Sequence, residues 1–276
     1  MKVHYIKNNF YNDGVIKLTN FLDSKSINIL REEASIHSLK QNFFSISKEA
    51  KAIASSIVNL LSEITEKQYY YIGESHAAYD QVDNARTWHK DLRGDLVTKE
   101  DEMSVVRAVI YLQDHKNYSY GTKIIKGSHL RTLYPFWSIK SLIKTIINII
   151  KNIKIIRIKN IFPVNIFRSE NLSVLPGDVG IWSLNTIHAG NFVRLKIFPN
   201  LFLPVFIDKF LDKYLRKFIK IEEKKRAIIS FTFGTRSLTT KNYVTERISR
   251  KAISAEFSEY LLDIKNIDNI VEVPHF

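Results

Sequence analysis

The chain has 276 residues, a hydrophobic content of 45% and no cysteine. This composition allows one large domain with a sizeable core, and it excludes disulfides, zinc–thiolate sites and thiol catalysis. The net charge is +13. The N-terminal segment has no apolar stretch typical of a secretory signal, and no uncharged apolar run of about 18 residues predicts a membrane-spanning helix. We therefore expect a cytoplasmic protein.

The N-terminal part predicts a short strand followed by helices. Residues Val15–Leu18 fit the strand, and a helix is expected from about Ser24, with Asp23 or Ser24 as its N-cap. A second helix fits residues 47–65, with Ser47 as N-cap. Its apolar positions recur at helical spacing, at 53, 57, 60, 61 and 64.

The rest of the chain is dominated by short runs rich in Val, Ile, Tyr and Phe, separated by Gly, Pro or Asn turns. This pattern is typical of an all-β sandwich or jelly-roll core packed behind the N-terminal helices. No repeat and no linker marks a second domain, so residues 1–276 are expected to form a single one. The predicted β segments are 69–82, 104–114, 121–129, 171–187 and 226–235.

Two basic, amphipathic segments interrupt the β pattern, at about 134–168 and 194–224. The charge is concentrated there, with seven basic and no acidic residues from Tyr134 to Arg168. Both are predicted to be helical insertions with aliphatic or aromatic side chains on one face. The opposite face carries Lys140, Lys144 and Lys151 in the first, and Lys209, Lys213 and Arg216 in the second.

Three interpretations of these insertions remain open. They could pack their apolar faces on the core, dock as a basic rim on an anionic membrane surface, or recognise an acidic soluble substrate. Nucleic acid is disfavoured as a partner, because large aliphatic residues alternate with the charges where stacking aromatics would be expected.

One constellation could carry chemistry. His89 and Asp91 stand two apart, a spacing that puts both side chains on one face of a β-strand. His188 follows a Pro-Gly-Asp turn and an apolar strand, 97 positions after Asp91, so folding must bring the two segments together. Two histidines and one carboxylate form the facial triad of non-haem Fe(II) oxygenases, which leaves positions open for a co-substrate and O2.

The chain resembles the phytanoyl-CoA dioxygenase family of Fe(II)/2-oxoglutarate oxygenases. The matching pieces, in order, are "YNDGVIKLTNFLDSKSINILREE", "WHKD", "VIYLQDHKNYSYGTKIIKGSHL", "LPGDVGIWSLNTIHAGN" and "RAIISFTFG". The resemblance implies a double-stranded β-helix (jelly-roll or cupin-like) fold with His89, Asp91 and His188 as iron ligands. It also implies Arg226 as the residue that binds the distal carboxylate of 2-oxoglutarate.

The chain departs from the family in the position of this arginine, which usually follows the distal histidine by a little over ten residues. Here Arg226 follows His188 by 38 positions, and Arg194 is a rival anchor only six positions after that histidine. Thr122 and Gln113 could contact 2-oxoglutarate from neighbouring strands, or have only core and edge roles. His129, in the GSH sequence, is predicted to be a structural turn residue that orders the rim of the site.

The expected function is a dioxygenase that uses Fe(II), 2-oxoglutarate and O2 and releases succinate and CO2. Halogenating relatives replace the carboxylate ligand by a small residue, so Asp91 favours hydroxylation of an aliphatic carbon. The basic segments suggest an anionic or amphiphilic substrate, such as a lipid-linked sugar acid or an acyl thioester, and allow a peripheral position on the inner face of the cytoplasmic membrane. The alternatives are a small soluble substrate, or a non-catalytic module that binds a membrane surface.

Overall fold

The computed structural model describes residues 9–38, 43–81, 89–92, 103–113, 122–130, 169–172, 174–190 and 226–250. Within these ranges the side chains of residues 80, 81, 169–171, 190 and 226 are not described. Both predicted basic insertions therefore lie outside the described residues. The expectation of a single domain over 1–276 stays a prediction.

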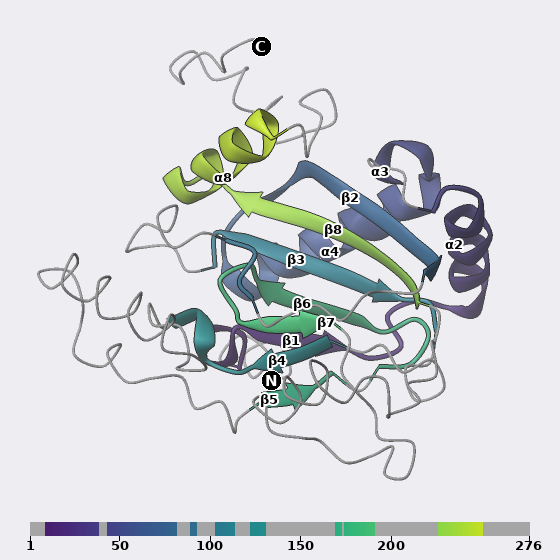
Figure 1. The fold of residues 1–276 in the computed structure, drawn as a ribbon, viewed down its shortest axis with the longest axis horizontal. Helices are drawn as coiled ribbons and strands as arrows, with labels where there is room; N and C mark the ends of the chain where they lie inside the picture. The colour runs from purple at the N-terminus through teal and green to yellow at the C-terminus, as the bar shows by residue number, and fades with distance from the viewer. Residues whose placement is uncertain are drawn as a thin grey trace, which may run out of the picture.

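The core is built from two antiparallel sheets (Figure 1). The larger has the order β1-β6-β3-β8-β2 and the smaller the order β5-β4-β7. The larger contains β1 (Val15–Leu18), β2 (Tyr69–Gln81), β3 (Val105–Tyr111), β6 (Val179–Ser183) and β8 (Arg226–Thr235). The smaller contains β4 (Thr122–Ile125), β5 (Ser169–Asn171) and β7 (His188–Gly190). The described strands do not close into a barrel, but the predicted sheet-rich jelly-roll core with flanking helices is confirmed.

The N-terminal helices cover one face of the larger sheet (Figure 1). They are α2 (Ser24–Ile36), α3 (Phe43–Ile46) and α4 (Lys48–Thr65). The Asp23 side chain caps α2 by accepting a hydrogen bond from Ser26 N, and Ser47 caps α4 by accepting one from Ala50 N. Both caps satisfy amide groups that the first helical turn leaves without partners, so the two predicted helix starts are confirmed.

The larger sheet separates two apolar layers because strand side chains alternate between its faces. Ala227, Ile229, Phe231 and Phe233 of β8 pack in the main core with the apolar face of α4, while Ile228 joins a second cluster that includes Ile124 of the smaller sheet. Fully burying each large aliphatic or aromatic side chain contributes about 1.5–3 kcal/mol. The alternation therefore fixes which face of the sheet looks toward β4 and β7.

The local structure differs from the expectation in two places. The apolar strand expected to run from the Pro-Gly-Asp turn to His188 ends earlier, because β6 ends at Ser183 and His188 opens the separate strand β7 after a turn. The helix α8 (Leu238–Ser249), capped by Ser237, was not predicted. No helix in the described ranges combines the length and apolarity needed to cross a membrane.

Candidate metal centre

His188 is positioned by the turn that carries the chain from β6 to β7. The amide of Ser183 and the hydroxyl of Thr186 both donate to the carbonyl of Gly14, at 3.1 and 3.0 Å. The Asn185 side chain donates to the carbonyl of His129 at 2.9 Å and accepts from Lys90 Nζ at 3.0 Å. Three segments distant in sequence thus hold one four-residue turn.

The GSH sequence supports the other end of this turn. The hydroxyl of Ser128 accepts a hydrogen bond from Ile187 N at 2.7 Å, one residue before His188. The buried ring of His129 contacts the carbonyl of Tyr11 through Nε2 at 3.0 Å. Burial lowers the pKa of His129 to about 4, so the ring is neutral at physiological pH. These contacts fit the structural role that we expected for His129.

His89 and Asp91 do not lie on a regular strand, contrary to the prediction. His89 forms an isolated antiparallel bridge with His188, in which each amide donates to the carbonyl of the other at 3.0 Å. The amides of Asp91 and Leu92 both donate to the carbonyl of Leu184, at 3.0 and 3.1 Å. The backbone of the β6–β7 turn therefore holds this segment and brings its two side chains to His188.

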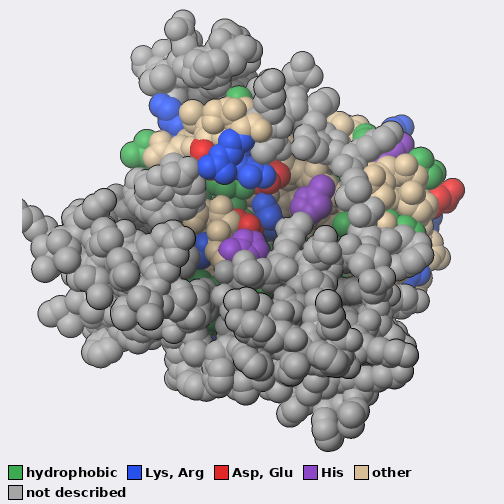
Figure 2. Space-filling view, in the orientation of Figure 1, with side chains coloured by type: hydrophobic (Ala, Val, Ile, Leu, Met, Phe, Trp, Pro, Cys, Tyr) green, Lys and Arg blue, Asp and Glu red, His purple; other side chains and the backbone are tan. Residues whose placement is uncertain are grey.

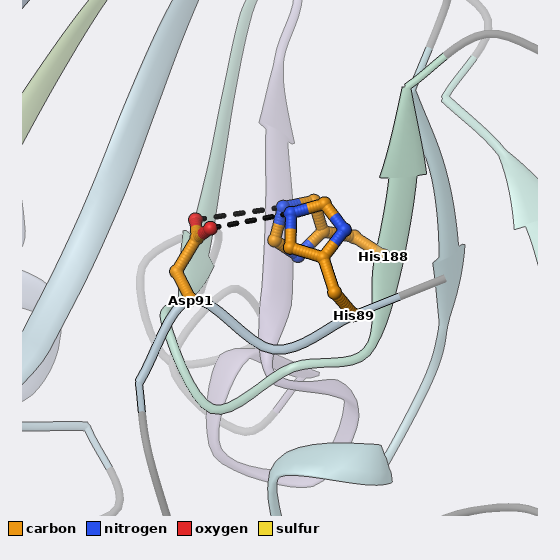
Figure 3. A group of neighbouring side chains, drawn as sticks. All are labelled: His89, Asp91 and His188. Carbon is orange, nitrogen blue, oxygen red and sulfur yellow. Dashed lines mark ion pairs between the residues drawn. The ribbon is translucent and has the colours of Figure 1, made fainter. Parts of the chain in front are cut away.

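The three side chains converge (Figure 3). His89 Nε2 lies 3.3 Å from Asp91 Oδ1, and His188 Nε2 lies 3.5 Å from Asp91 Oδ2. One potential ligand atom from each residue lies within 4.8 Å of the other two, and this is the one group in the described ranges that could hold a metal ion. Figure 2 shows histidine, acidic and basic side chains together in a hollow on one face of the molecule.

The protonation of His188 suits metal binding. Its Nδ1 lies 3.0 Å from the carbonyl of Thr186, which can only accept, so Nδ1 carries the hydrogen and Nε2 keeps a lone pair. Burial lowers the pKa of His188 to about 4, although the charge of Asp91 acts in the opposite direction. The ring is therefore a neutral imidazole whose free nitrogen faces the other two residues.

The carboxylate of Asp91 is ionised. Burial alone would raise its pKa, but the charge of Arg107 and the neighbouring imidazoles outweigh burial and hold the pKa well below its usual range. Asp91 Oδ2 is buried and accepts no hydrogen bond from a described residue. An ionised carboxylate whose two oxygens each face one imidazole nitrogen fits a divalent cation.

Sequence reasoning missed a charged network beside this group. Arg107 of β3 places Nη1 2.9 Å from Asp91 Oδ2 and donates from Nη2 to Glu74 Oε2 at 3.0 Å. A signal was present, because Arg107 interrupts an apolar strand run and Glu74 stands within a run of aromatic and small residues. Buried charges in strands rarely occur without a partner.

The remaining predicted site residues are placed only in part. Thr122 is buried and accepts a hydrogen bond from the Tyr111 hydroxyl at 2.9 Å. Gln113 lies just after β3, and its buried Oε1 has no hydrogen-bond partner among the described residues. Arg226 opens β8 and its backbone pairs with Gln81 of β2, but its side chain is outside the description. Outside it as well lie Arg194, Lys140, Lys144, Lys151, Lys209, Lys213 and Arg216.

No family model and no curated protein matches the chain. Among solved structures it is similar to the epimerase SnoN in complex with Fe3+, α-ketoglutarate and nogalamycin RO, at 12% identity over 85% of this chain and 84% of SnoN, with a TM-score of 0.52. HygX from Streptomyces hygroscopicus with iron bound is 14% identical over 84% of this chain and 86% of HygX, with a TM-score of 0.51.

A third similar structure is SnoK, a non-haem, α-ketoglutarate-dependent carbocyclase from nogalamycin biosynthesis. It is 10% identical over 84% of this chain and 83% of SnoK, with a TM-score of 0.51. The narrower resemblance to the phytanoyl-CoA dioxygenase family is not matched by a family model and stays a prediction. The His89–Asp91–His188 group could hold a metal ion, and the similar SnoN structure contains Fe3+ and α-ketoglutarate (2-oxoglutarate). The chain has the jelly-roll fold that SnoN, SnoK and HygX share.

Proposed function

We propose that this chain is an Fe(II)- and 2-oxoglutarate-dependent oxygenase that hydroxylates an aliphatic C–H bond. One observation carries the proposal: two imidazoles and one ionised carboxylate, supplied by segments distant in the sequence, converge within 4.8 Å in a jelly-roll core. Two histidines and one carboxylate suit Fe(II) and leave coordination positions open for small molecules.

The charges around the group support a dianionic co-substrate. Among the described residues of the network, the charges of Asp91 and Glu74 are balanced by those of Arg107 and Arg247. A divalent cation would therefore add two positive charges that these residues do not neutralise. 2-Oxoglutarate carries two negative charges, so the carboxylate at its keto-acid end would offset part of the charge of the metal in a site where an unpaired charge is costly, and its distal carboxylate would need a separate cation.

The co-substrate's distal carboxylate requires a cation, and we propose Arg226, with Arg194 as the rival. The support for Arg226 is its place in the sequence "RAIISFTFG", which matches the family pattern, and it opens β8, the neighbour of β3 that carries Arg107. A guanidinium binds a carboxylate through two parallel hydrogen bonds. Thr122 and the unsatisfied carbonyl of Gln113 are proposed to lie near the co-substrate, as the sequence suggested. When bound, iron would supply the oxidising chemistry with O2 as the oxidant, one oxygen atom going to the substrate and the other to 2-oxoglutarate, which would be converted to succinate and CO2.

The residues of the chain have simpler tasks. His89, Asp91 and His188 would hold the metal, and the buried surroundings of His188 would limit access of water. The similar structures include an epimerase and a carbocyclase, so hydroxylation is the part of the proposal that needs a product analysis. A product heavier than its substrate by one oxygen atom would support hydroxylation. An isomer or a product with two fewer hydrogens would contradict it.

Anaerobic titration tests the cofactors directly. Adding Fe(II) and 2-oxoglutarate to the metal-free protein should give a weak charge-transfer absorption in the visible range, and Asp91→Ala should abolish it. Asp13→Ala is the control, since Asp13 is paired with Lys126 and lies outside the metal-ligand group. If Asp91→Ala keeps the wild-type absorption, the proposed function is wrong.

We also propose an anionic or amphiphilic substrate, which could be met at a membrane surface on the cytoplasmic side. The support is the concentration of basic residues on the amphipathic segments 134–168 and 194–224. Each basic residue near anionic lipid contributes about 1 kcal/mol to binding. Flotation with anionic and neutral vesicles tests membrane binding, and equal recovery from both would contradict it. Succinate release, screened over lipid and soluble extracts, would separate a lipid substrate from a soluble metabolite.

A further inference from the structure

Arg107 joins two buried carboxylates that belong to different parts of the fold. It lies in the middle of β3, where its Cα partners are Trp182 of β6 and Thr232 of β8. Its Nη1 lies 2.9 Å from Asp91 and its Nη2 lies 3.0 Å from Glu74. Only 14% of the side chain is exposed, so the loss of either partner would leave a largely buried charge without compensation.

Glu74 is itself held from three sides. Its Oε2 accepts hydrogen bonds from Thr232 of β8 at 2.9 Å and from Tyr243 of α8 at 2.7 Å, in addition to the bond from Arg107. Its Oε1 accepts from Arg247 of α8. Burial alone would raise the pKa of Glu74, but the two arginines lower it below its ordinary value, so the group is a carboxylate. The orientation of Glu74 is therefore fixed by β8 and α8 together.

Asp91 needs such support more than the two histidines do. His188 belongs to β7 and has its own Nδ1 contact, and His89 is joined to His188 by two backbone hydrogen bonds. Asp91 lies in a bend after the bridge, where no strand alternation directs its side chain. Arg107 forms an ion pair with the Asp91 oxygen Oδ2, which also faces His188 Nε2.

We infer that Arg107 is a positioning residue for the metal centre, which orients the Asp91 carboxylate toward the metal, and that Glu74 and α8 in turn fix Arg107. This inference rests on the proposed function, since it assumes that His89, Asp91 and His188 bind a metal. It also gives α8 a role in the centre, although α8 contributes no ligand. Substituting a residue that hydrogen-bonds to a metal ligand typically lowers the metal affinity by about 10–100-fold.

The experiment measures Co(II) binding to the metal-free full-length protein, by calorimetry and by the visible absorption of the bound ion. Arg107→Lys keeps the positive charge but has one nitrogen, which cannot bridge two carboxylates. We expect it to weaken Co(II) binding by roughly 10–100-fold and to change the absorption spectrum. Glu74→Gln should weaken binding in the same direction. The matched control is Glu246→Gln, which makes the same change at a residue of α8 paired with Arg250.

A charge-only role for Arg107 predicts a different result, because Arg107→Lys would then bind Co(II) like the wild type and with the same spectrum. That result would overturn the inference. If Arg107→Lys and Glu74→Gln do not fold, Tyr243→Phe decides, since it removes one hydrogen bond to Glu74 and keeps the ring. Weaker Co(II) binding by folded Tyr243→Phe supports the inference, and unchanged binding overturns it.

The proposed function is tested separately by Asp91→Asn. If the wild type binds Co(II) and Asp91→Asn does not, the metal centre is supported, and this conclusion does not depend on the result for Arg107→Lys. If Asp91→Asn binds Co(II) as well as the wild type, the metal centre itself is wrong.

Discussion

Replacing Gly14 by alanine should destabilise the protein through a specific collision. Gly14 has a φ of +72°, and a Cβ there would lie 2.2 Å from His129 Nδ1 and 2.7 Å from its Cγ. The ring cannot easily withdraw, because it is 1% exposed and its Nε2 contacts the carbonyl of Tyr11. The left-handed backbone alone costs a residue with a Cβ about 1–2 kcal/mol, and overpacking of a buried site adds about 1–3 kcal/mol.

Gly127 provides a matched control for this substitution. It has the same φ of +72°, but a Cβ there would meet only the carbonyl oxygen of Asn12, at 3.4 Å. Gly127→Ala should therefore cost only the backbone part, about 1–2 kcal/mol. We would measure the free energy of unfolding by urea denaturation, followed by far-UV circular dichroism, for Gly14→Ala, Gly127→Ala and both substitutions in a His129→Ala background.

The clash explanation predicts that Gly14→Ala costs more than Gly127→Ala in the wild type, and that the excess disappears once His129 is alanine. Equal costs in the wild type would refute it. Gly14→Ala should also weaken Co(II) binding, because the carbonyl of Gly14 holds the turn before His188. Gly127→Ala should affect Co(II) binding less, since the hydrogen bonds from Ser183 and Thr186 go to the carbonyl of Gly14 and not to that of Gly127.

Two further predictions concern the same region. The pKa of Glu74 is lowered from 4.5, so the contribution of Glu74 to stability is complete at neutral pH and decreases as the pH falls through its folded-state pKa. The difference in free energy of unfolding between the wild type and Glu74→Gln, measured by urea denaturation, should therefore shrink below pH 4.5. A difference that stays constant into the acid range would contradict this prediction. The Trp182 ring lies 5.4 Å from that of His188, and Trp88 directly precedes His89 in the sequence, so Co(II) should quench the fluorescence of both. Trp182→Phe should reduce the metal-dependent quenching, and quenching that stays at the wild-type level in the double variant Trp88→Phe, Trp182→Phe would place the ion elsewhere.

The fold was predictable where local signals and burial agree. Residues 15–18 form the predicted strand, and the caps Asp23 and Ser47 begin the two predicted helices. The Pro-Gly-Asp turn was predicted, but the end of β6 at Ser183 was not predictable from apolar content. The turn after β6 is stabilised by partners outside the segment, such as Gly14 and Ser128. Helix α8 was missed because the residues that it buries include the polar Thr239 and Thr240. Thr240 lies beside Gly234, and Tyr243 donates a hydrogen bond to Glu74.

In the site, too, residue type and local spacing were readable from the sequence, whereas contacts between distant strands were not. His89, Asp91 and His188 were found because their residue types limit the chemistry, and the structure brings them together. Over the described residues 89–92, one bridge to His188 and two hydrogen bonds to Leu184 replace the strand that was expected to present His89 and Asp91. Arg107 and Glu74 were missed because their role depends on register across β2, β8 and β3, which a single sequence does not specify.

Two separate supports therefore hold the three side chains. The backbone of the β6–β7 turn, bonded to Gly14 and Ser128, carries His188 and, through the bridge, His89. Side chains of the larger sheet and α8 hold Asp91 through Arg107. Metal affinity depends on the distance between the carboxylate and the imidazoles, so neither support is sufficient alone. A jelly roll suits this arrangement, because the turn between its two sheets lies beside the inner face of the larger one, where a buried charge network can form.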